Sequence, residues 1–330
     1  MTTVLSIREF LEEECEDRGY ELEDYEGELP RWCKGCGDFS VLTAVQKLLR
    51  DRQIDPEKVV CVSGIGCSSR FPHYLKTYGF HGIHGRPLPI TTGVALARPD
   101  LHLITITGDG DCFSIGGNHW IHAIRYNVHA MVLVFDNEIY GLTKKQASPT
   151  TRQGVSTNTT PRGAYLKSLN PLSVVMGVTN VSFLAQTATW LPGHLEKTIV
   201  KAWDHKGLSF IRILQRCPAY LTSSFEGTGA DFPAIFLEHE EGIGVDKGML
   251  KKSPTVSHNP RDIHEAQRIA ILEDKFPMGL IYWNPDVPTY EETRRSRIEN
   301  INRKERIEAL NAELNKHAVK QAASRGVHGK

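Results

Sequence analysis

Short apolar runs alternate with amphipathic stretches over most of the chain. The apolar runs, which predict buried strands, are residues 59–63, 101–107, 130–135 and 209–214. The stretches that predict helices are residues 38–50, 88–97, 118–127 and 195–205. Strands that read as continuous apolar runs are typical of parallel sheets covered on both faces. The repeated order of strand and helix therefore predicts an α/β fold with a doubly wound parallel sheet.

The helix at 38–50 shows the pattern most clearly. Its apolar residues recur at helical spacing and would share one face: Val41, Leu42, Val45, Leu48 and Leu49. Asp38 or Ser40 is expected to cap its start, because their side chains can accept bonds from free backbone N–H groups. Farther along, residues 143–162 are rich in Thr, Ser, Pro and Gly and predict a long loop.

Two polar motifs follow neighbouring predicted strands. Thr107-Gly108-Asp109-Gly110-Asp111 ends the run 101–107, and Asp136-Asn137-Glu138-Ile139-Tyr140-Gly141 follows the run 130–135. The carboxyl ends of parallel strands meet at one edge of the sheet, where α/β folds bind cofactors. Glycines let the backbone approach phosphate, and Asp109 and Asn137 supply the hard oxygen ligands that Mg²⁺ prefers. The paired motifs predict a thiamine diphosphate site.

Four of the seven cysteines lie in contexts that suit metal binding. Cys33 and Cys36 are separated by two residues, Cys67 lies in a glycine-rich turn, and Cys217 precedes a proline. Such spacing lets two sulfurs reach one site while backbone N–H groups stay free to bond cluster sulfides. The set predicts a four-thiolate iron–sulfur site. Zinc is the competing metal, and Cys67 and Cys217 could instead be small core residues. No ligand role is expected for the remaining three: Cys15, Cys61 and Cys112.

Composition excludes several classes of protein. The formal net charge of the 330 residues is zero, which argues against binding to nucleic acid or to a membrane surface. No apolar run approaches the roughly 18 residues that a membrane-spanning helix needs, and no secretory signal is evident. An odd number of cysteines without such a signal argues against a disulfide framework. We expect a cytoplasmic protein.

The two ends of the chain differ in charge. Residues 1–28 contain eleven Asp and Glu against two Lys and Arg, whereas residues 291–330 contain ten Lys and Arg against six Asp and Glu. Residues 290–317 predict a basic amphipathic helix, which either is a solvated tail or clamps a partner subunit or the acidic end. We expect an acidic extension at 1–28, a cofactor domain at 29–225 and a C-terminal extension at 226–330.

With these motifs the chain resembles the β subunit, which binds thiamine diphosphate, of the 2-oxoacid:ferredoxin oxidoreductases. The resemblance covers residues 29–220 and extends more loosely to about 292. The run from Asn137 to Lys144 and the run from Gln146 to Thr150 resemble the 2-oxoglutarate branch. The family implies a thiamine-diphosphate-binding fold with iron–sulfur cluster loops. It also implies thiamine diphosphate, Mg²⁺ and a [4Fe–4S] cluster as cofactors, with coenzyme A as co-substrate.

The resemblance implies roles for individual residues. Cluster ligands would be Cys33, Cys36, Cys67 and Cys217, and the magnesium ligands Asp109, Asn137 and Ile139. The other cofactor-binding residues would be Gly66, His84, Gly85, Arg86, Gly108, Gly110, Asp111, Tyr140, Gly141 and Leu142. Leu142 would hold thiamine in its bent form, and His84 would face the cofactor unless it is purely structural. Lys144 would face the substrate. The family often has Lys-Gly-Gln where this chain has Lys144-Lys145-Gln146, so either lysine could do so.

The implied activity is the CoA-dependent oxidative decarboxylation of 2-oxoglutarate to succinyl-CoA and CO₂, with electrons passed to ferredoxin, in a reversible reaction. A partner α subunit would supply the activating glutamate in a heterodimer or a dimer of heterodimers, so this chain alone should be inactive. The alternatives are a pyruvate or broad 2-oxoacid oxidoreductase, a non-redox thiamine-dependent decarboxylase and a zinc-stabilised assembly protein. The sequence leaves the preferred 2-oxoacid and the physiological direction open.

Overall fold

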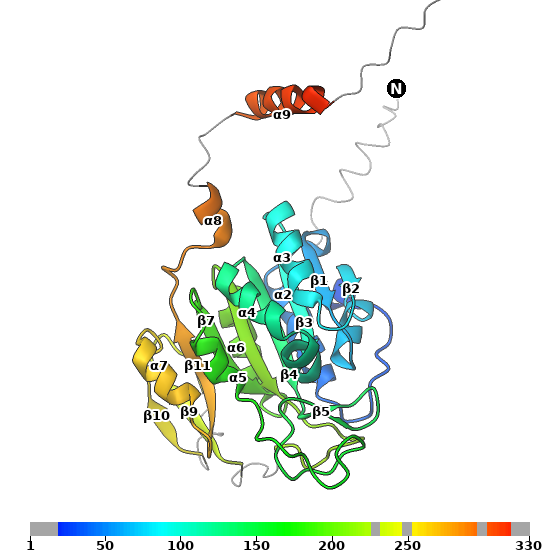
Figure 1. Cartoon of the computed structure of the whole chain (residues 1–330), viewed down its shortest axis with the longest axis vertical. Coiled ribbons are helices and arrows are strands. Elements are labelled where there is room, and N and C mark those ends of the chain that lie inside the picture. Colours follow the sequence, from blue (N-terminus) through cyan, green and yellow to red (C-terminus); the bar gives the residue numbers. More distant parts are fainter. Residues whose placement is uncertain (1–18, 226–231, 246–252, 296–301, 318–330) are drawn as a thin grey trace, which may run out of the picture. The chain divides into compact units, whose positions relative to one another are not determined.

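The computed structural model describes residues 19–225, 232–245, 253–295 and 302–317, and it divides into two units, Met1–Tyr290 and Glu291–Lys330 (Figure 1). The strands of the first unit are β1 (Val59–Ser63), β2 (Tyr78–His81), β3 (His102–Gly108), β4 (Ala130–Asp136), β5 (Ile139–Tyr140), β6 (Gln146–Ala147), β7 (Phe183–Ala188), β8 (Leu208–Leu214), β9 (Ala234–Glu238), β10 (Thr255–Ser257) and β11 (Phe276–Trp283). Its longer helices are α2 (Asp38–Asp51), α3 (Pro87–Ala97), α4 (Gly117–Tyr126), α5 (Pro171–Met176), α6 (Pro192–Trp203) and α7 (Ile263–Ala270).

Nine strands form one sheet in the order β10-β9-β11-β7-β8-β4-β3-β1-β2. From β7 to β2 every neighbouring pair is parallel, which confirms the expectation for this part of the chain. The sheet is mostly, not wholly, parallel, because β11, a strand that the sequence patterns did not predict, pairs with β7 antiparallel. Strands β9 and β10 run parallel to β11, so the segment after residue 225 extends the same sheet.

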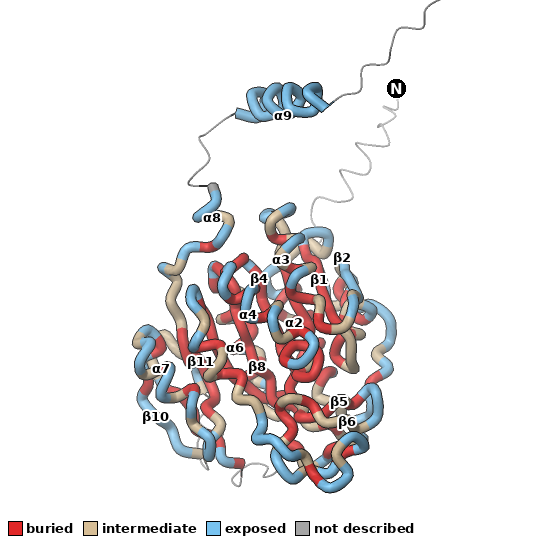
Figure 2. Tube along the Cα trace, in the orientation of Figure 1, coloured by how far each residue is buried: buried red, intermediate tan, exposed pale blue. Residues whose placement is uncertain are grey.

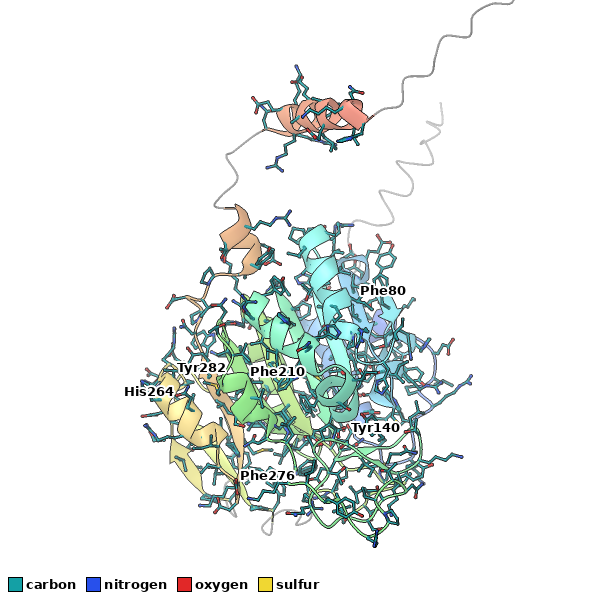
Figure 3. The ribbon with its side chains drawn as sticks, in the orientation of Figure 1. Phe80, Tyr140, Phe210, His264, Phe276 and Tyr282 are labelled. Atoms are coloured by element: carbon teal, nitrogen blue, oxygen red, sulfur yellow. The ribbon has the colours of Figure 1, made fainter. Side chains whose placement is uncertain are left out.

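Helices cover both faces of this sheet, as a doubly wound fold requires. Along β1, Val59 and Cys61 join the core cluster that also contains Leu195 and Ile199 of α6. The alternate residues Val60 and Val62 join a second cluster, whose other members include residues of α3, α4, α5 and α7. Phe210 of β8 and Tyr282 of β11, labelled in Figure 3, belong to this second cluster. The buried positions therefore follow the strands, as Figure 2 shows.

Helix α2 begins differently from the expectation. Its N-cap residue is Gly37, and neither Asp38 nor Ser40 provides a capping hydrogen bond, because Asp38 is already the first helical residue and is fully buried. A Cβ atom at position 37 would lie 2.5 Å from Oγ1 of Thr189, so only glycine fits against the turn that follows β7. This close approach places the start of α2, with Cys36 just before it, at the carboxyl edge of the sheet.

The expected helix at 290–317 is found as two pieces, α8 (Tyr290–Arg295) and α9 (Arg303–His317), with residues 296–301 outside the described part. Helix α9 buries none of its residues, and Ile307, Leu310 and Leu314 are 49–60% exposed. The acidic segment, apart from residues 19–28, and Cys15 also lie outside the described residues. Among the helices that the structure describes, none is long and apolar enough to cross a membrane.

Candidate cofactor and cluster site

A pocket opens at the carboxyl edge of the sheet, where β1, β3 and β4 end, as the strand-end motifs predict. The residues expected to bind a cofactor that line it are Gly66, Cys67, His84, Gly108, Asp109, Gly110, Asp111, Asn137, Ile139, Tyr140, Gly141 and Leu142. Five further lining residues were not anticipated from the sequence: Ile65, Ser68, Phe135, Thr143 and Gln215. Gly85, Arg86 and Lys144 do not line this pocket.

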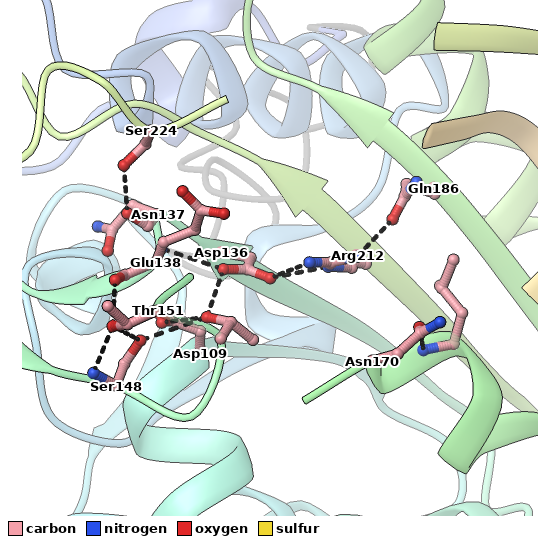
Figure 4. Close-up of polar contacts among 12 residues, drawn as sticks. Asp109, Asp136, Asn137, Glu138, Ser148, Thr151, Asn170, Gln186, Arg212 and Ser224 are labelled. Atoms are coloured by element: carbon pink, nitrogen blue, oxygen red, sulfur yellow. Dashed lines mark hydrogen bonds and ion pairs between the residues drawn. The ribbon is translucent and has the colours of Figure 1, made fainter. Parts of the chain in front are cut away.

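Asp109, directly after β3, is held by the loop that follows β6. Oγ1 of Thr150 lies 2.8 Å from Oδ2 of Asp109 and 2.8 Å from Oδ1 of Asp136. Asp136 in turn forms a buried ion pair of 2.6 Å with Arg212, which also donates to Oε1 of Gln186 (Figure 4). Burial raises the pKa of Asp109 to about 7, and the charge of Asp136 adds to the effect.

The oxygen donors of this region suit a hard cation. The Asp109 carboxylate, the Asn137 side-chain amide and the Ile139 carbonyl belong to residues that line the same pocket. Oδ1 of Asn137 accepts from the Ile139 N–H at 3.2 Å, and its backbone carbonyl accepts from Ser224 at 2.7 Å (Figure 4). Carboxylate, amide and carbonyl oxygens are ligands that Mg²⁺ takes together with phosphate. The donor set therefore fits a magnesium ion bound to a diphosphate.

The backbone just beyond Asn137 is strained. Glu138 is buried and has a φ of 61°, in the left-handed region that non-glycine residues rarely adopt. Three contacts hold it there: its carbonyl accepts from Thr151 at 2.6 Å, its carboxylate pairs with Arg152 at 3.1 Å, and its N–H donates to Asp136 at 3.1 Å. Burial raises the pKa of Glu138 to about 7, with a further contribution from Asp136 and an opposing one from Arg152. The loop 143–162 thus shapes the site, although its sequence predicted only a loop.

Asp111 organises the glycine-rich turns around the pocket. Its Oδ1 accepts from the backbone N–H groups of Ile65 at 3.1 Å and Gly85 at 2.6 Å, and lies 2.5 Å from Nδ1 of His84. Its Oδ2 accepts from Thr107 at 2.7 Å. Both carboxylate oxygens are therefore engaged within the protein. Asp111 therefore fixes the turns around the pocket and orients His84. The sequence pattern alone did not distinguish this role from direct cofactor binding.

Arg86 and Gly85 do not line the pocket but stabilise the turns next to it. Arg86 donates through Nη1 to the carbonyls of Ile115 at 3.2 Å and Gly85 at 3.3 Å, so it closes the turn after Asp111. Gly85 has a φ of 70°, and a Cβ there would lie 2.6 Å from the Gly116 nitrogen. Only glycine can occupy this position without moving the backbone.

Lys144 and Lys145 lie in an unusual turn beyond the pocket. Their φ angles are 72° and 71°, so two successive lysines are left-handed. Asn158 holds both, because its Nδ2 donates to the Lys144 carbonyl at 2.6 Å and its N–H donates to the Lys145 carbonyl at 2.8 Å. Lys144 is exposed and Lys145 is half-buried. The left-handed backbone at Lys145 gives a physical reason for the glycine that the family often has there.

The predicted cluster cysteines gather beside the same pocket. Trp32 donates from Nε1 to the Cys67 carbonyl at 2.6 Å, which ties the Cys33–Cys36 turn to the turn after β1. A Cβ at Gly141 would lie 3.5 Å from Sγ of Cys217 and 3.8 Å from Sγ of Cys67. Burial raises the pKa of Cys67 to about 12, and the charge of Asp38 and the neighbouring thiols of Cys217 and Cys33 raise it further. Three chain segments thus bring four thiols to one region: the Cys33–Cys36 turn, the turn after β1 and the turn after β8.

Within the described residues, no group of three or more His, Cys, Asp or Glu side chains is close enough to hold a single metal ion. A [4Fe–4S] cluster makes a different demand, because each of its four irons takes one thiolate at a separate corner. Cys33 and Cys36 come from one turn and Cys67 and Cys217 from two others, so each thiol could ligate a separate iron. Cys61 and Cys112 lie elsewhere, in the two apolar core clusters.

Known proteins similar to this chain identify its family. The family described as "Thiamine pyrophosphate enzyme, C-terminal TPP binding domain" matches residues 58–213. The family that describes the C-terminal part of the pyruvate ferredoxin oxidoreductase β subunit matches residues 249–297. The Mycobacterium tuberculosis 2-oxoglutarate oxidoreductase subunit KorB is 45% identical over 216 residues, which cover 64% of this chain and 58% of that protein.

Two further relatives are covered more fully. The β subunit of Aeropyrum pernix 2-oxoacid:ferredoxin oxidoreductase 2 is 35% identical over 79% of this chain and 82% of its own length. A solved structure of 2-oxoglutarate:ferredoxin oxidoreductase from Magnetococcus marinus, with 2-oxoglutarate, coenzyme A and succinyl-CoA bound, superposes with a TM-score of 0.75 and 32% identity, over 88% of this chain and 96% of that one. The chain therefore belongs to the family of β subunits of the 2-oxoacid:ferredoxin oxidoreductases.

Proposed function

We propose that this chain is the thiamine-diphosphate-binding β subunit of a 2-oxoglutarate:ferredoxin oxidoreductase. With its α subunit it would convert 2-oxoglutarate and coenzyme A to succinyl-CoA and CO₂ and pass two electrons, one at a time, to ferredoxin. The observation that carries this proposal is the position of Cys67, which lines the oxygen-rich pocket and neighbours Cys33 and Cys217. An organic cofactor and a redox centre would thus be adjacent.

The oxygen donors would hold the cofactor by its diphosphate. Asp109, Asn137 and the Ile139 carbonyl would bind Mg²⁺, while Gly108 and Gly110 let the backbone come close to the phosphates. Leu142, which is 49% exposed at the pocket, offers an apolar support for the bent form of thiamine. Thiamine diphosphate, when bound, supplies the electron sink that makes loss of CO₂ from a 2-oxoacid possible. His84, aimed by Asp111, would face the reacting region.

The four thiols would hold the iron–sulfur cluster. Cys33, Cys36, Cys67 and Cys217 are the proposed ligands, and a [4Fe–4S] cluster there would accept and release single electrons. Gly141 keeps the space between Cys67 and Cys217 free of a side chain, and it also lines the cofactor pocket. The cytoplasm, where thiols stay reduced, is the proposed location.

The pocket needs a partner to complete it. No glutamate is among the described residues that line it, and Glu138 is turned to Arg152 instead. The carboxylate that activates thiamine would therefore come from the α subunit, in a heterodimer or a dimer of heterodimers.

Lys144 or Lys145 would meet the distal carboxylate of 2-oxoglutarate, since neither lysine has an ion-pair partner within the described part of the chain.

The test is a spectrum and an assay on the complex purified without oxygen. We expect a broad visible absorption, an EPR signal on reduction, and CoA-dependent reduction of ferredoxin with 2-oxoglutarate in preference to pyruvate. A colourless protein that contains zinc, or decarboxylation without ferredoxin reduction, would reject the proposal. Equal rates with several 2-oxoacids would keep the reaction but replace the substrate by the broader class for which the Aeropyrum relative is named.

Individual substitutions show whether the thiols are ligands. Replacing Cys33, Cys36, Cys67 or Cys217 by Ser should bleach the visible spectrum, because a hydroxyl is a poor replacement for thiolate at iron. Cys61→Ser is the matched control, since Cys61 is fully buried in the core cluster under α2. A Cys217→Ser complex with the full iron content would remove Cys217 from the ligand set.

A further inference from the structure

One buried amide touches both the thiol region and the cofactor pocket. Gln215 follows β8, is 2% exposed and lines the pocket that contains Asp109 and Asn137. Its Nε2 donates toward Sγ of Cys36 at 3.6 Å. Its own N–H donates to the Asp136 carbonyl at 2.8 Å, which fixes its backbone at the end of β4. The side chain is therefore held where a cluster thiolate and the cofactor pocket meet.

A buried carboxylate accompanies this amide. Asp38 is fully buried, and neither of its oxygens has a hydrogen-bond partner, nor does Oε1 of Gln215. Gln215 and Cys36 lie close enough to stabilise its charge, although neither reaches it with the geometry of a hydrogen bond. An acceptor-only carboxylate favours the donor end of the Gln215 amide on its side, which is also the side of Cys36. Leaving such a group buried and unpaired is unfavourable for folding, and a redox role is one physical reason for keeping it.

We propose that Gln215 and Asp38 set the reduction potential of the cluster held by the four cysteines, in opposite directions. This inference rests on the iron–sulfur cluster of the proposed function. An N–H donor at a cysteine sulfur stabilises the more negative, reduced cluster and raises its potential, whereas a buried carboxylate beside it lowers the potential. Gln215 and Asp38 would thus act through Cys36 and adjust how readily the cluster accepts an electron from the adjoining cofactor pocket.

The test is EPR-monitored potentiometry of the complex purified without oxygen. Gln215→Leu should lower the midpoint potential and Asp38→Asn should raise it. Loss of one hydrogen bond to a charged sulfur corresponds to about tenfold in the reduction equilibrium, or about 59 mV for one electron. The two shifts in midpoint potential must have opposite signs, because a general loosening that admits water would shift the potentials of both variants in the same direction.

Gln46→Leu is the matched control. Gln46 is also a buried glutamine, on α2, but it donates to the Tyr25 carbonyl and away from the thiols, so its loss should leave the potential unchanged. If Gln215→Leu binds too little iron to measure, Gln215→Met keeps a similar length without a donor and should also lower the potential.

Three results would overturn the inference: unchanged potentials, shifts of one sign for both residues, or loss of iron in every variant, which would make the pair structural. A wild-type complex without any iron–sulfur signal would instead refute the proposed function.

Discussion

The hydroxyl of Thr150 lies 2.8 Å from Oδ2 of Asp109, although the two residues are 41 positions apart in the chain. The same hydroxyl lies 2.8 Å from Asp136 at the end of β4. Asp136 is fixed in turn by its ion pair with Arg212 of β8. One loop residue thus joins the ends of two neighbouring strands and determines where a candidate metal ligand points.

Removing the Thr150 hydroxyl should weaken cofactor binding without touching a proposed ligand. Thr150→Val keeps the size of the side chain but leaves Asp109 without its orienting contact. We expect the affinity for thiamine diphosphate with Mg²⁺ to fall about tenfold, the scale of lost outer contacts at metal sites. Thr150→Ser keeps the hydroxyl and should bind as the wild type does in isothermal titration calorimetry. Equal affinities for the Val and Ser variants would show that the contact is not used.

Removing a proposed magnesium ligand should have a larger effect. Asp109→Ala or Asn137→Ala deletes an oxygen donor, and cofactor affinity should fall by tenfold or more. Iron content should stay at the wild-type level, because the thiols come from other segments. Retained cofactor affinity in either variant would contradict the metal assignment.

Substitution of the two lysines in the left-handed turn should show whether either one recognises the charge of the substrate. If Lys144 or Lys145 meets the distal carboxylate of 2-oxoglutarate, its replacement by Met should raise KM for that acid about ten- to a hundredfold. KM for 2-oxobutyrate, which lacks this carboxylate, should change little. Similar losses on both substrates would assign the lysine to the cofactor or to the fold.

The strained backbone at Lys145 should lower the free energy of unfolding. A φ of 71° is unfavourable for any side chain with a Cβ, by roughly 1–2 kcal/mol, and is unrestricted for glycine. Lys145→Gly should therefore raise the free energy of unfolding by about 1 kcal/mol, after allowance for the greater freedom of glycine in the unfolded chain. Lys145→Ala is the control that removes the ammonium but keeps the Cβ. A Gly variant no more stable than the Ala variant would show that Asn158 does not hold the turn under strain.

Stability should fall in mild acid through His205. Its Nε2 pairs with Ser182, its Nδ1 accepts from Trp283, and burial lowers its pKa to about 4. Between this value and the ordinary histidine pKa near 6.5, the unfolded chain binds a proton that the native protein does not, so stability is lost as pH falls. The loss amounts to at most about 3 kcal/mol.

His205→Phe tests this linkage. The variant should be less stable than the wild type near pH 7.5, because Ser182 and Trp283 lose a hydrogen-bond partner. Its stability should nevertheless fall less than that of the wild type between pH 7.5 and pH 5. Urea midpoints at both pH values measure the difference. His264→Gln, at an exposed position of α7, should leave the pH dependence unchanged. A His205→Phe variant with the full wild-type pH dependence would place the buried proton elsewhere.

Local sequence patterns were sufficient to predict the fold class and the positions of the strands that carry the site. Apolar runs and the glycines or polar residues that end them located β1, β3 and β4 to within one residue, because strand formation and turn formation depend on near neighbours. The same strand ends carried the glycine and aspartate motif and Asn137, and the cysteine spacings marked the thiol segments. From these the sequence by itself determined the fold class, the family and the edge of the sheet at which the pocket lies.

Tertiary structure alone decided which distant side chains meet there. Thr150 reaches both Asp109 and Asp136 because β3 and β4 are neighbours. Gln215 reaches Cys36, 179 residues away, because β8 lies next to β7, whose following turn packs on the start of α2. Strand β11 runs antiparallel to β7, and an apolar run has no direction that a sequence reader could detect. The double left-handed turn at Lys144 is likewise imposed by Asn158 from another part of the loop. Each of these depends on strand order and long-range hydrogen bonds, which no local periodicity encodes.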